Sequence, residues 1–369
     1  MRVIVIGAGP AGLACAACAK QQGAEVEILE RARRIAPAWH GHYDRLHLHT
    51  HRNRSALPML PIPKTVARYP SRQDFIAYLE TYASTFGLRP HLDCAVHQVR
   101  REAGVWQVAH GNGIDHAEAV IFATGLNGTP YRPDLPGQSS FPGPVLHSSG
   151  YRNAESFRDM HVLVVGFGNS GGDIALDLAE AGVSVTLSQR GPVNILPHDL
   201  FGIPITSMGG LRKVLPYRLA DALTAPIMRA KIGRPEHYGL QSAGKGPAAQ
   251  VIEDGRVPLI DNGTLAAIRR GAIRMRPAIA RIADQAVKFV DDTEDQVDAI
   301  ILATGYRTDL RKLLPDAHEV LDGSGLPLQI GAPGPGNGLF FCSYKASADG
   351  QLFQTAREAR AIAAAIAGS

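Results

Sequence analysis

The same spacing of three glycines occurs twice in the chain, in GAGPAG and in GFGNSG. The residues are Gly7, Gly9, Gly12, Gly166, Gly168 and Gly171. In this spacing the first glycine permits a tight turn, the second lets a pyrophosphate approach the backbone, and the third lets a helix pack closely on a strand. The unpaired amides and the positive end of that helix attract phosphate. Two dinucleotide sites are therefore expected.

A strand, a helix and a second strand surround each set of glycines. Around the first set, Gly23 terminates the helix and the second strand ends at Glu30. Around the second set, Gly182 terminates the helix and the second strand ends in residues 188–190, Ser-Gln-Arg. A carboxylate accepts ribose hydroxyls but repels a 2′-phosphate, which a guanidinium binds. The first site therefore suits FAD or NAD and the second NADPH. Alternatively, Arg190 is a surface arginine, and the neighbouring glutamine serves a cofactor without that phosphate.

Two further stretches resemble each other, AVIFATGLNGTP and AIILATGYRTD. Each is an apolar strand that stops at a glycine, as is typical where the chain passes between domains and the backbone approaches a cofactor. We expect an α/β fold of two Rossmann-like dinucleotide-binding domains, with an NADPH domain inserted in an FAD domain. The expected segments are residues 1–150 (FAD), 151–300 (NADPH) and 301–369 (return to the FAD fold).

Composition excludes several other classes of protein. The 369 residues are 45% hydrophobic and 20% charged, and no apolar run approaches the roughly 20 residues that span a membrane. The net charge of +4 is small and scattered, so no nucleic-acid partner is expected. Four cysteines give no disulfide framework, and the first glycine turn leaves no room for a secretory signal ahead of it. The prediction is a cytoplasmic protein.

Two groups of reactive side chains have competing interpretations. Cys15 and Cys18 form a CxxC that suits either redox chemistry or close packing on an Ala-rich helix, and packing is favoured. In LHLHTHR, His47, His49 and His51 alternate, so on a strand they would share one face, where imidazoles could bind zinc. Since no carboxylate or thiolate flanks them, no metal site is expected.

Two segments in the second half of the chain also have alternative roles. A helix beginning at about Gln351 could aim its positive N-terminus at a flavin ring or merely close the core. The stretch from Gly209 to Gly233 looks amphipathic. It could touch a membrane surface. We favour packing on its own protein, or lining a substrate entrance.

Between the two glycine sets lies FPGPVLHSSGY. The fingerprint of class B flavin-dependent monooxygenases is FxGxxxHxxx followed by an aromatic residue. This stretch matches it at every fixed position, with Phe141, Gly143, His147 and Tyr151. The chain therefore resembles that family. Arg152 after the aromatic fits the flavin-containing monooxygenase subgroup better than the Baeyer-Villiger enzymes. Stretches such as YDRLHLHT, LPMLPIP, YPSRQDFIAYLETYA, VNILPHDLFG and GTLAAIRRGAIRM look like the plant YUCCA enzymes, the indole-3-pyruvate monooxygenases.

The resemblance implies tight FAD, NADPH as hydride donor, and NADP retained to protect a C4a-(hydro)peroxyflavin that inserts one oxygen atom from O2 into a small organic substrate. The residues that it assigns to FAD are Gly7, Gly9, Gly12, Glu30, Arg31, Trp39, Thr124 and Gln351. Those that it assigns to NADP are Gly166, Gly168, Asn169, Ser170, Gly171 and Arg190. A homodimer is left open.

The candidate catalytic residues are His49, Asn169 and His147. Heteroatom-oxidising relatives carry Asn near the flavin at the position of His49, whereas the YUCCA pattern has His there. This departure favours attack on a carbonyl, as in decarboxylation of a 2-oxo acid, over N- or S-oxygenation. His147 has no acidic partner nearby in the sequence, so a linker that couples the two domains is favoured over a general base.

Two other functions stay in competition with the monooxygenase. A disulfide reductase would use Cys15 and Cys18, but these lie on the pyrophosphate-binding helix, far from a flavin ring. A redox sensor, or an NADPH oxidase without a dedicated organic substrate, would carry the same cofactor-binding motifs. The sequence therefore leaves this last alternative open.

Overall fold

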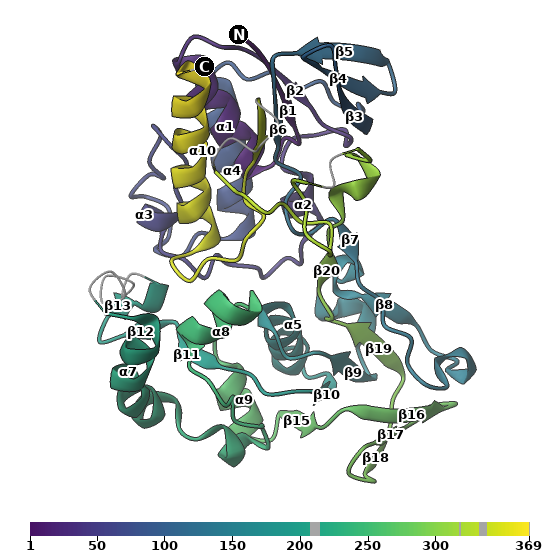
Figure 1. Cartoon of the computed structure of the whole chain (residues 1–369). Coiled ribbons are helices and arrows are strands. Elements are labelled where there is room, and N and C mark those ends of the chain that lie inside the picture. The colour runs from purple at the N-terminus through teal and green to yellow at the C-terminus, as the bar shows by residue number, and fades with distance from the viewer. Residues whose placement is uncertain (207–214, 317–318, 332–337, 369) are drawn as a thin grey trace. The chain divides into compact units, whose positions relative to one another are not determined.

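The computed structural model of the chain describes residues 1–206, 215–316, 319–331 and 338–368 (Figure 1). The chain divides into two compact units. The first unit comprises Met1–Gly41, Thr50–Thr129 and Tyr306–Ser369, and the second comprises His42–His49 and Pro130–Gly305. The second unit is thus inserted in the first, and it includes eight residues that lie between two pieces of the first.

This division differs from the expected segments 1–150, 151–300 and 301–369. The first exchange falls about 20 residues earlier than residue 150, at residues 129/130, while the second falls at 305/306. Strand β8 (Val145–His147) explains the earlier exchange, because it pairs in parallel with β19 (Ala299–Leu302) in the sheet of the second unit. The chain has therefore entered that unit before the fingerprint begins.

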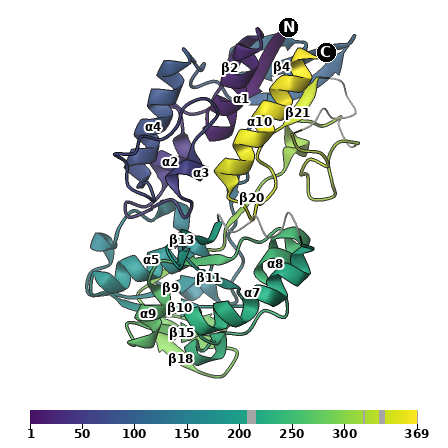
Figure 2. The ribbon, with the colours of Figure 1, turned by 90° about the vertical axis from the view of Figure 1, so that its left-hand side faces the viewer.

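The first unit is built on a parallel sheet in the order β2-β1-β6-β21. Its main elements are β1 (Arg2–Ile6), α1 (Pro10–Gln21), β2 (Glu25–Leu29), β6 (Ala119–Phe122), β21 (Leu339–Phe341) and α10 (Gln351–Ala367). Every residue of β6 and β21 is buried, as expected of parallel strands covered on both faces. Helices α1 and α10 run side by side (Figures 1 and 2).

Smaller elements complete the first unit. A three-stranded antiparallel sheet has the order β3-β4-β5, and α4 begins with a capping box in which Ser71 and Asp74 satisfy each other's backbone amides. The bounds are α2 (Pro37–Gly41), α3 (Arg52–Ser55), α4 (Arg72–Thr85), β3 (Val96–Glu102), β4 (Val105–His110) and β5 (Gly113–Ala117).

The second unit repeats the parallel design, with strands in the order β15-β10-β9-β19-β8. Besides β8 and β19, its main elements are β9 (His161–Val165), α5 (Asn169–Glu180), β10 (Ser184–Ser188) and β15 (Ile273–Arg276). The expected α/β fold class is therefore confirmed in both units. In each of them a glycine turn joins a buried central strand to a helix.

The remaining elements of the second unit surround this sheet. They are β11 (Ile195–Pro197), β12 (Asp199–Leu200), β13 (Ile203–Pro204), α7 (Tyr217–Ile232), α8 (Pro247–Asp254), β14 (Leu259–Asp261), α9 (Thr264–Arg269), β16 (Ile279–Ala283), β17 (Ala286–Phe289) and β18 (Glu294–Gln296). Short strands β7 (Thr129–Pro130) and β20 (Tyr306–Arg307) lie where the chain passes from one unit to the other.

Candidate functional site

The first glycine turn is shaped by contacts that leave no room for a side chain at two positions. Gly7 has φ +108°, and a Cβ there would lie 2.8 Å from the carbonyl oxygen of Ala123. A Cβ on Gly12 would lie 1.8 Å from the carbonyl oxygen of Gly7. Both glycines are therefore required by the protein's own packing, which brings α1 against the turn.

Gly9 differs from its neighbours, because a Cβ there would meet nothing within 4 Å. Its φ of −79° is open to any residue, and it caps the N-terminus of the 12-residue helix α1. Packing within the protein gives no reason for glycine at this point. A ligand that approaches the helix N-terminus does, so the turn fits the pyrophosphate of a dinucleotide.

Glu30 follows β2 and is buried, with 4% of its surface exposed. Its Oε2 accepts a hydrogen bond from the amide of Ala8 at 2.8 Å, and its Oε1 accepts one from the amide of Ala32 at 2.9 Å. The carboxylate therefore braces the glycine turn, a role that the sequence did not indicate. Each carboxylate oxygen can accept a further hydrogen bond, so ribose hydroxyls can still bind.

The other residues assigned to FAD lie in the first unit. Arg31 is exposed, and Trp39, in α2, packs edge-on against Phe75 with the ring centroids 4.5 Å apart. Thr124 follows β6 and its hydroxyl is 2.6 Å from that of Tyr344. Glu30 and Thr124 lie just beyond the carboxyl ends of parallel strands, where ligands bind in such sheets.

Gln351 is the first residue of α10, and its side-chain amide donates to the hydroxyl of Ser343 at 2.9 Å. Buried side chains along α10 pack in the first unit, including Leu352, Ile362 and Ile366. The helix therefore closes the core, one of its two expected roles. Its other role, an N-terminus aimed at the flavin, stays a prediction.

The second glycine turn repeats the geometry of the first. Gly166 has φ +106°, and its Cβ would lie 2.6 Å from the carbonyl oxygen of Ala303, while a Cβ on Gly171 would lie 1.9 Å from that of Gly166. A Cβ on Gly168 would again meet nothing within 4 Å. The alanines of the two ATG segments thus buttress the two turns, a contact that explains their shared sequence. The turn fits a second pyrophosphate.

The end of β10 offers this second site no acid. Ser188 is buried and donates to the carbonyl oxygen of Pro277 at 2.7 Å. The amide side chain of Gln189 donates to the carbonyl oxygen of Gly191. Arg190 is exposed, and its guanidinium has no ion pair with any residue that the structure describes. A guanidinium in this position is available to a 2′-phosphate.

Asn169 and Ser170 open helix α5. The side chain of Asn169 is engaged on both sides, since its Oδ1 accepts from the amide of Ile260 at 2.8 Å and its Nδ2 donates to the carbonyl of Pro258 at 3.3 Å. The Asn169 side chain therefore connects helix α5 to β14 and the residue before it, and both of its polar atoms already have hydrogen-bond partners. Ser170 hydrogen-bonds with the hydroxyl of Tyr43.

His147 is completely buried at the end of β8. Its Nδ1 accepts from the amide of Ser149 at 3.1 Å, so the proton is on Nε2, which donates to the carbonyl oxygen of Gly305 at 2.9 Å. Burial lowers the pKa of the imidazole. A neutral ring bonded on both sides has no lone pair left to act as a base. It instead joins the fingerprint to the last residue of the second unit.

The other fixed positions of the fingerprint also have structural reasons. A Cβ on Gly143 would lie 2.1 Å from the carbonyl oxygen of Asp298. Tyr151 is buried and donates from its hydroxyl to Oδ2 of Asp177, on α5, at 2.6 Å. Phe141 packs in a buried apolar cluster with strand residues of the second unit.

His49 lies in the segment His42–His49 of the second unit. Its Nε2 is 3.7 Å from Oδ2 of Asp173, and its Nδ1 is 3.2 Å from Nδ2 of Asn262. Burial lowers the pKa of His49, and the charge of Asp173 opposes that shift. The structure thus surrounds His49 with polar side chains that come from α5 and from the loop after β14, which no local pattern in the sequence indicated.

LHLHTHR contributes no strand to the sheets, so its three histidines do not share the face that a strand would give them. Each histidine has its own partner: Nδ1 of His47 is 2.8 Å from the carbonyl oxygen of Arg45, and His51 caps α3 by accepting from the amide of Asn53. Among the described residues no group of three or more His, Cys, Asp or Glu side chains could hold a metal ion.

Cys15 and Cys18 are buried in α1 and form no disulfide. Burial raises the pKa of Cys18 to about 11, so its thiol stays protonated at neutral pH. The side chain of Cys15 contacts Cys342, which is also buried. A protonated, buried thiol is a poor nucleophile, and this arrangement supports packing rather than disulfide exchange.

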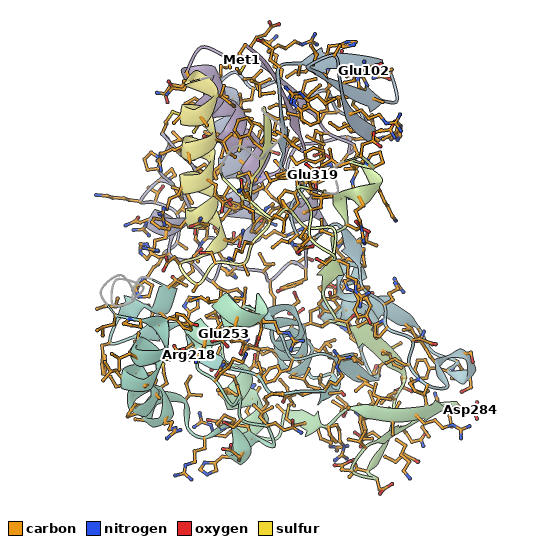
Figure 3. The ribbon with its side chains drawn as sticks, in the orientation of Figure 1. Met1, Glu102, Arg218, Glu253, Asp284 and Glu319 are labelled. Atoms are coloured by element: carbon orange, nitrogen blue, oxygen red, sulfur yellow. The ribbon has the colours of Figure 1, made fainter. Side chains whose placement is uncertain are left out.

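The amphipathic stretch forms α7 from Tyr217; residues 209–214 of that stretch lie outside the described part of the chain. One face packs through Ala220 and Ile232, and Arg218 bridges to Glu253 of α8 at 2.8 Å (Figure 3). The opposite face leaves Leu223 56% exposed. Across the described residues, no helix is both long and apolar enough to cross a membrane.

Comparison with known sequences identifies relatives over most of the chain. The profile of the family described as pyridine nucleotide-disulphide oxidoreductase matches residues 4–198. Indole-3-pyruvate monooxygenase YUCCA1 of Oryza sativa subsp. japonica is 37% identical over 328 residues, which cover 88% of this chain and 81% of that protein. The probable indole-3-pyruvate monooxygenase YUCCA1 of Arabidopsis thaliana is 38% identical over 313 residues, or 83% of this chain and 76% of that protein.

Solved structures share the fold. A flavin-containing monooxygenase from Stenotrophomonas maltophilia superposes with a TM-score of 0.74 at 22% identity, covering 100% of this chain and 98% of that one. An oxidized steroid monooxygenase bound to NADP gives a TM-score of 0.76 at 18% identity, covering 100% of this chain and 85% of that one.

Proposed function

The chain belongs to the pyridine nucleotide-disulphide oxidoreductase family and to the class B flavin-dependent monooxygenases, and from this membership we propose that it oxidatively decarboxylates a 2-oxo acid of the indole-3-pyruvate type. It is a flavin-dependent monooxygenase that uses FAD and NADP(H) and acts on an organic substrate. One observation carries the choice of substrate: 37% identity, over 88% of the chain, to an indole-3-pyruvate monooxygenase.

The residues of the first unit are proposed to hold FAD. The open face of Gly9 and the N-terminus of α1 would bind its pyrophosphate, and Glu30 would accept its ribose hydroxyls while it braces the turn. Bound FAD supplies the activation of O2, with electrons from NADPH. The protein's own part is to bind and orient the cofactors and to control protons near the substrate.

The second unit is proposed to hold NADP through the turn of Gly168 and through Arg190. The turn leaves room for a pyrophosphate, and the exposed guanidinium of Arg190 would take the 2′-phosphate. His147 is proposed to couple the domains, because it ties the fingerprint to Gly305, beyond which the chain returns to the first unit.

His49 is proposed to lie beside the reacting substrate. Because burial lowers its pKa, the imidazole is neutral at pH 7 and supplies no proton to an oxygen nucleophile. Attack on a carbonyl needs such an unprotonated nucleophile, whereas oxygen transfer to nitrogen or sulfur needs a protonated one. The neutral ring therefore favours a 2-oxo acid.

The test measures the amounts of all substrates consumed and all products formed. Indole-3-pyruvate, NADPH, O2 and a proton should yield indole-3-acetate, CO2, NADP⁺ and water, with one product molecule formed per NADPH. With ¹⁸O2, one labelled oxygen should enter the new carboxylate and the other should enter water. Phenylpyruvate and a tertiary amine serve as comparison substrates.

The same measurement separates the alternatives. If the amount of hydrogen peroxide formed equals the amount of NADPH consumed with every substrate, the protein is an NADPH oxidase or a redox sensor. Oxygenation of the amine with no turnover of either 2-oxo acid would identify a heteroatom oxygenase.

A cytoplasmic location and a homodimeric state are part of this proposal. The cysteines are all free, which suits a reducing compartment. Light scattering of the purified holoprotein would decide between monomer and dimer. Fractionation of cells with an antibody to the chain would decide the location.

A further inference from the structure

Asp173, on the first turns of α5, is the centre of a polar cluster in the second unit. Its carboxylate is only 8% exposed. Oδ2 accepts from the hydroxyl of Tyr43 at 2.9 Å and faces Nε2 of His49 at 3.7 Å, while Oδ1 accepts from Nδ2 of Asn262 at 3.2 Å. Two segments far apart in the sequence, residues 42–49 and the loop after β14, thus converge on one carboxylate.

Asn262 defines the proton position on the ring of His49. Its Nδ2 lies 3.2 Å from Oδ1 of Asp173 and 3.2 Å from Nδ1 of His49. The two hydrogens of the amide serve these two acceptors, and the reverse orientation would place the amide oxygen against a carboxylate. Nδ1 is therefore an acceptor, and the proton of a neutral His49 ring is on Nε2, which faces Asp173.

The charged and titratable groups around His49 come from three segments. Asp173 faces it from α5, His47 from its own segment, and His198 from the turn after β11, with ring centroids 6.5 Å apart. His198 in turn lies 3.6 Å from the carboxylate of Asp199. Tyr43 stays protonated, since burial and Asp173 raise its pKa well above the ordinary value, and its hydroxyl donates to Asp173.

We propose that Asp173 is a positioning residue for His49: together with Asn262 and Tyr43 it holds the orientation of the imidazole ring and keeps its proton on Nε2. The proposal rests on the role of His49 given above. Asp173 lies two residues beyond Gly171, so the carboxylate that orients His49 belongs to the same helix whose N-terminus would bind the NADP pyrophosphate.

Helix α5 provides a matched control one turn further on. Asp177 accepts from the hydroxyl of Tyr151 at 2.6 Å, and Arg45 lies 3.6 Å from it. This second Tyr–Asp pair has similar chemistry on the same helix, but no contact with His49 is recorded for it among the described residues. Loss of either carboxylate should disturb α5 to a similar degree, whereas only Asp173 should affect His49.

The experiment uses the FAD-bound full chain labelled with ¹⁵N-histidine, in which long-range ¹H–¹⁵N correlation distinguishes imidazole tautomers. The signals of His49 are assigned by their loss in His49→Gln. In Asp173→Asn we expect the ring to lose the pure Nε2–H pattern and to titrate at lower pH than in wild type, because a neighbouring negative charge is gone. Product formation per enzyme should fall on the order of tenfold.

The control variant Asp177→Asn should leave the tautomer and titration of His49 as in wild type. Asn262→Ala should let the proton occupy both ring nitrogens, and it provides a second test if Asp173→Asn does not fold. Identical His49 signals in wild type and in whichever of these two variants folds, or the same change in Asp177→Asn, would overturn the proposal. The spectra decide this even if wild type turns over no 2-oxo acid, so the two proposals fail separately.

Discussion

The two glycine turns have nearly identical backbones and different surroundings. Each glycine of the second set lies 159 residues after its counterpart, and the contacts of the missing Cβ atoms agree between the sets, as do the φ angles of the first glycines, +108° and +106°. With the same offset Glu30 corresponds to Gln189, and Arg31 to Arg190. Both sites therefore carry an exposed arginine at the same position.

What distinguishes the two sites is the residue before that arginine. Glu30 places a buried negative charge against its glycine turn, and Gln189 is neutral and turns its amide to the backbone of Gly191. We therefore expect a 2′-phosphate to be repelled at the first site and tolerated at the second. We expect the arginine to contribute to phosphate binding only where no carboxylate precedes it, so that the choice of ligand depends on the pair of residues and not on Arg190 alone.

The largest effect, a loss of stability, is expected from substituting the third glycine, which is packed in the same way in both turns. Gly12→Ala should cost at least about 3 kcal/mol in free energy of unfolding, because its Cβ would lie 1.8 Å from the carbonyl oxygen of Gly7. Gly9→Ala should change that free energy by less than about 1 kcal/mol but weaken FAD binding. Urea unfolding and FAD titration of both variants measure the contrast. Equal losses of stability would contradict it, and Gly171→Ala with Gly168→Ala repeats the test in the second unit.

A smaller effect, on the preference for NADPH over NADH, is expected when the second site is changed to resemble the first. Gln189→Glu should raise the KM for NADPH relative to NADH roughly thirtyfold, about 2 kcal/mol, because a carboxylate would face the 2′-phosphate. Arg190→Ala should shift the same ratio in the same direction, and Arg31→Ala is the control that should leave it alone. Steady-state kinetics with both nucleotides give the ratio. If Gln189→Glu leaves it as in wild type, the pair does not select the cofactor.

The smallest effect should come from the reverse change at the first site. Glu30→Gln should weaken FAD binding about tenfold, since one amide hydrogen of the glutamine would face the backbone amide of Ala8 or of Ala32. Fluorescence titration of the apoprotein with FAD measures the change. Glu30→Asp, which keeps the charge but shortens the reach, serves as a partial control. Undiminished affinity in Glu30→Gln would mean that neither the brace nor the negative charge of Glu30 contributes to FAD binding.

The sequence predicted what depends on short stretches of chain. Both strand–turn–helix patterns and the helix from Gln351 are present. The second strands end at Leu29, one residue before the predicted Glu30, and at Ser188, within the predicted residues 188–190. Glycine spacing and apolar runs indicate these elements because the forces that form them act between residues close in sequence.

Contacts between distant residues were not predictable in the same way. The brace from Glu30 to Ala8, the buttress of Ala303 on Gly166, and the convergence on Asp173 each join segments that only the tertiary fold brings together. The contacts of His49 with Asp173 and Asn262 are likewise long-range, and the alternation of histidines in LHLHTHR did not indicate them.

The insertion of the second unit sets an order for folding during synthesis. All residues of that unit have been made once the ribosome reaches Gly305, whereas the sheet of the first unit lacks its edge strand β21 until Phe341, and α1 lacks its partner α10 until Ala367. Newly made β6, which ends at Phe122, must therefore wait for its second neighbour until residues 339–341 are made. The exposed apolar edge of the first unit is the part of the nascent chain that most needs protection by a chaperone.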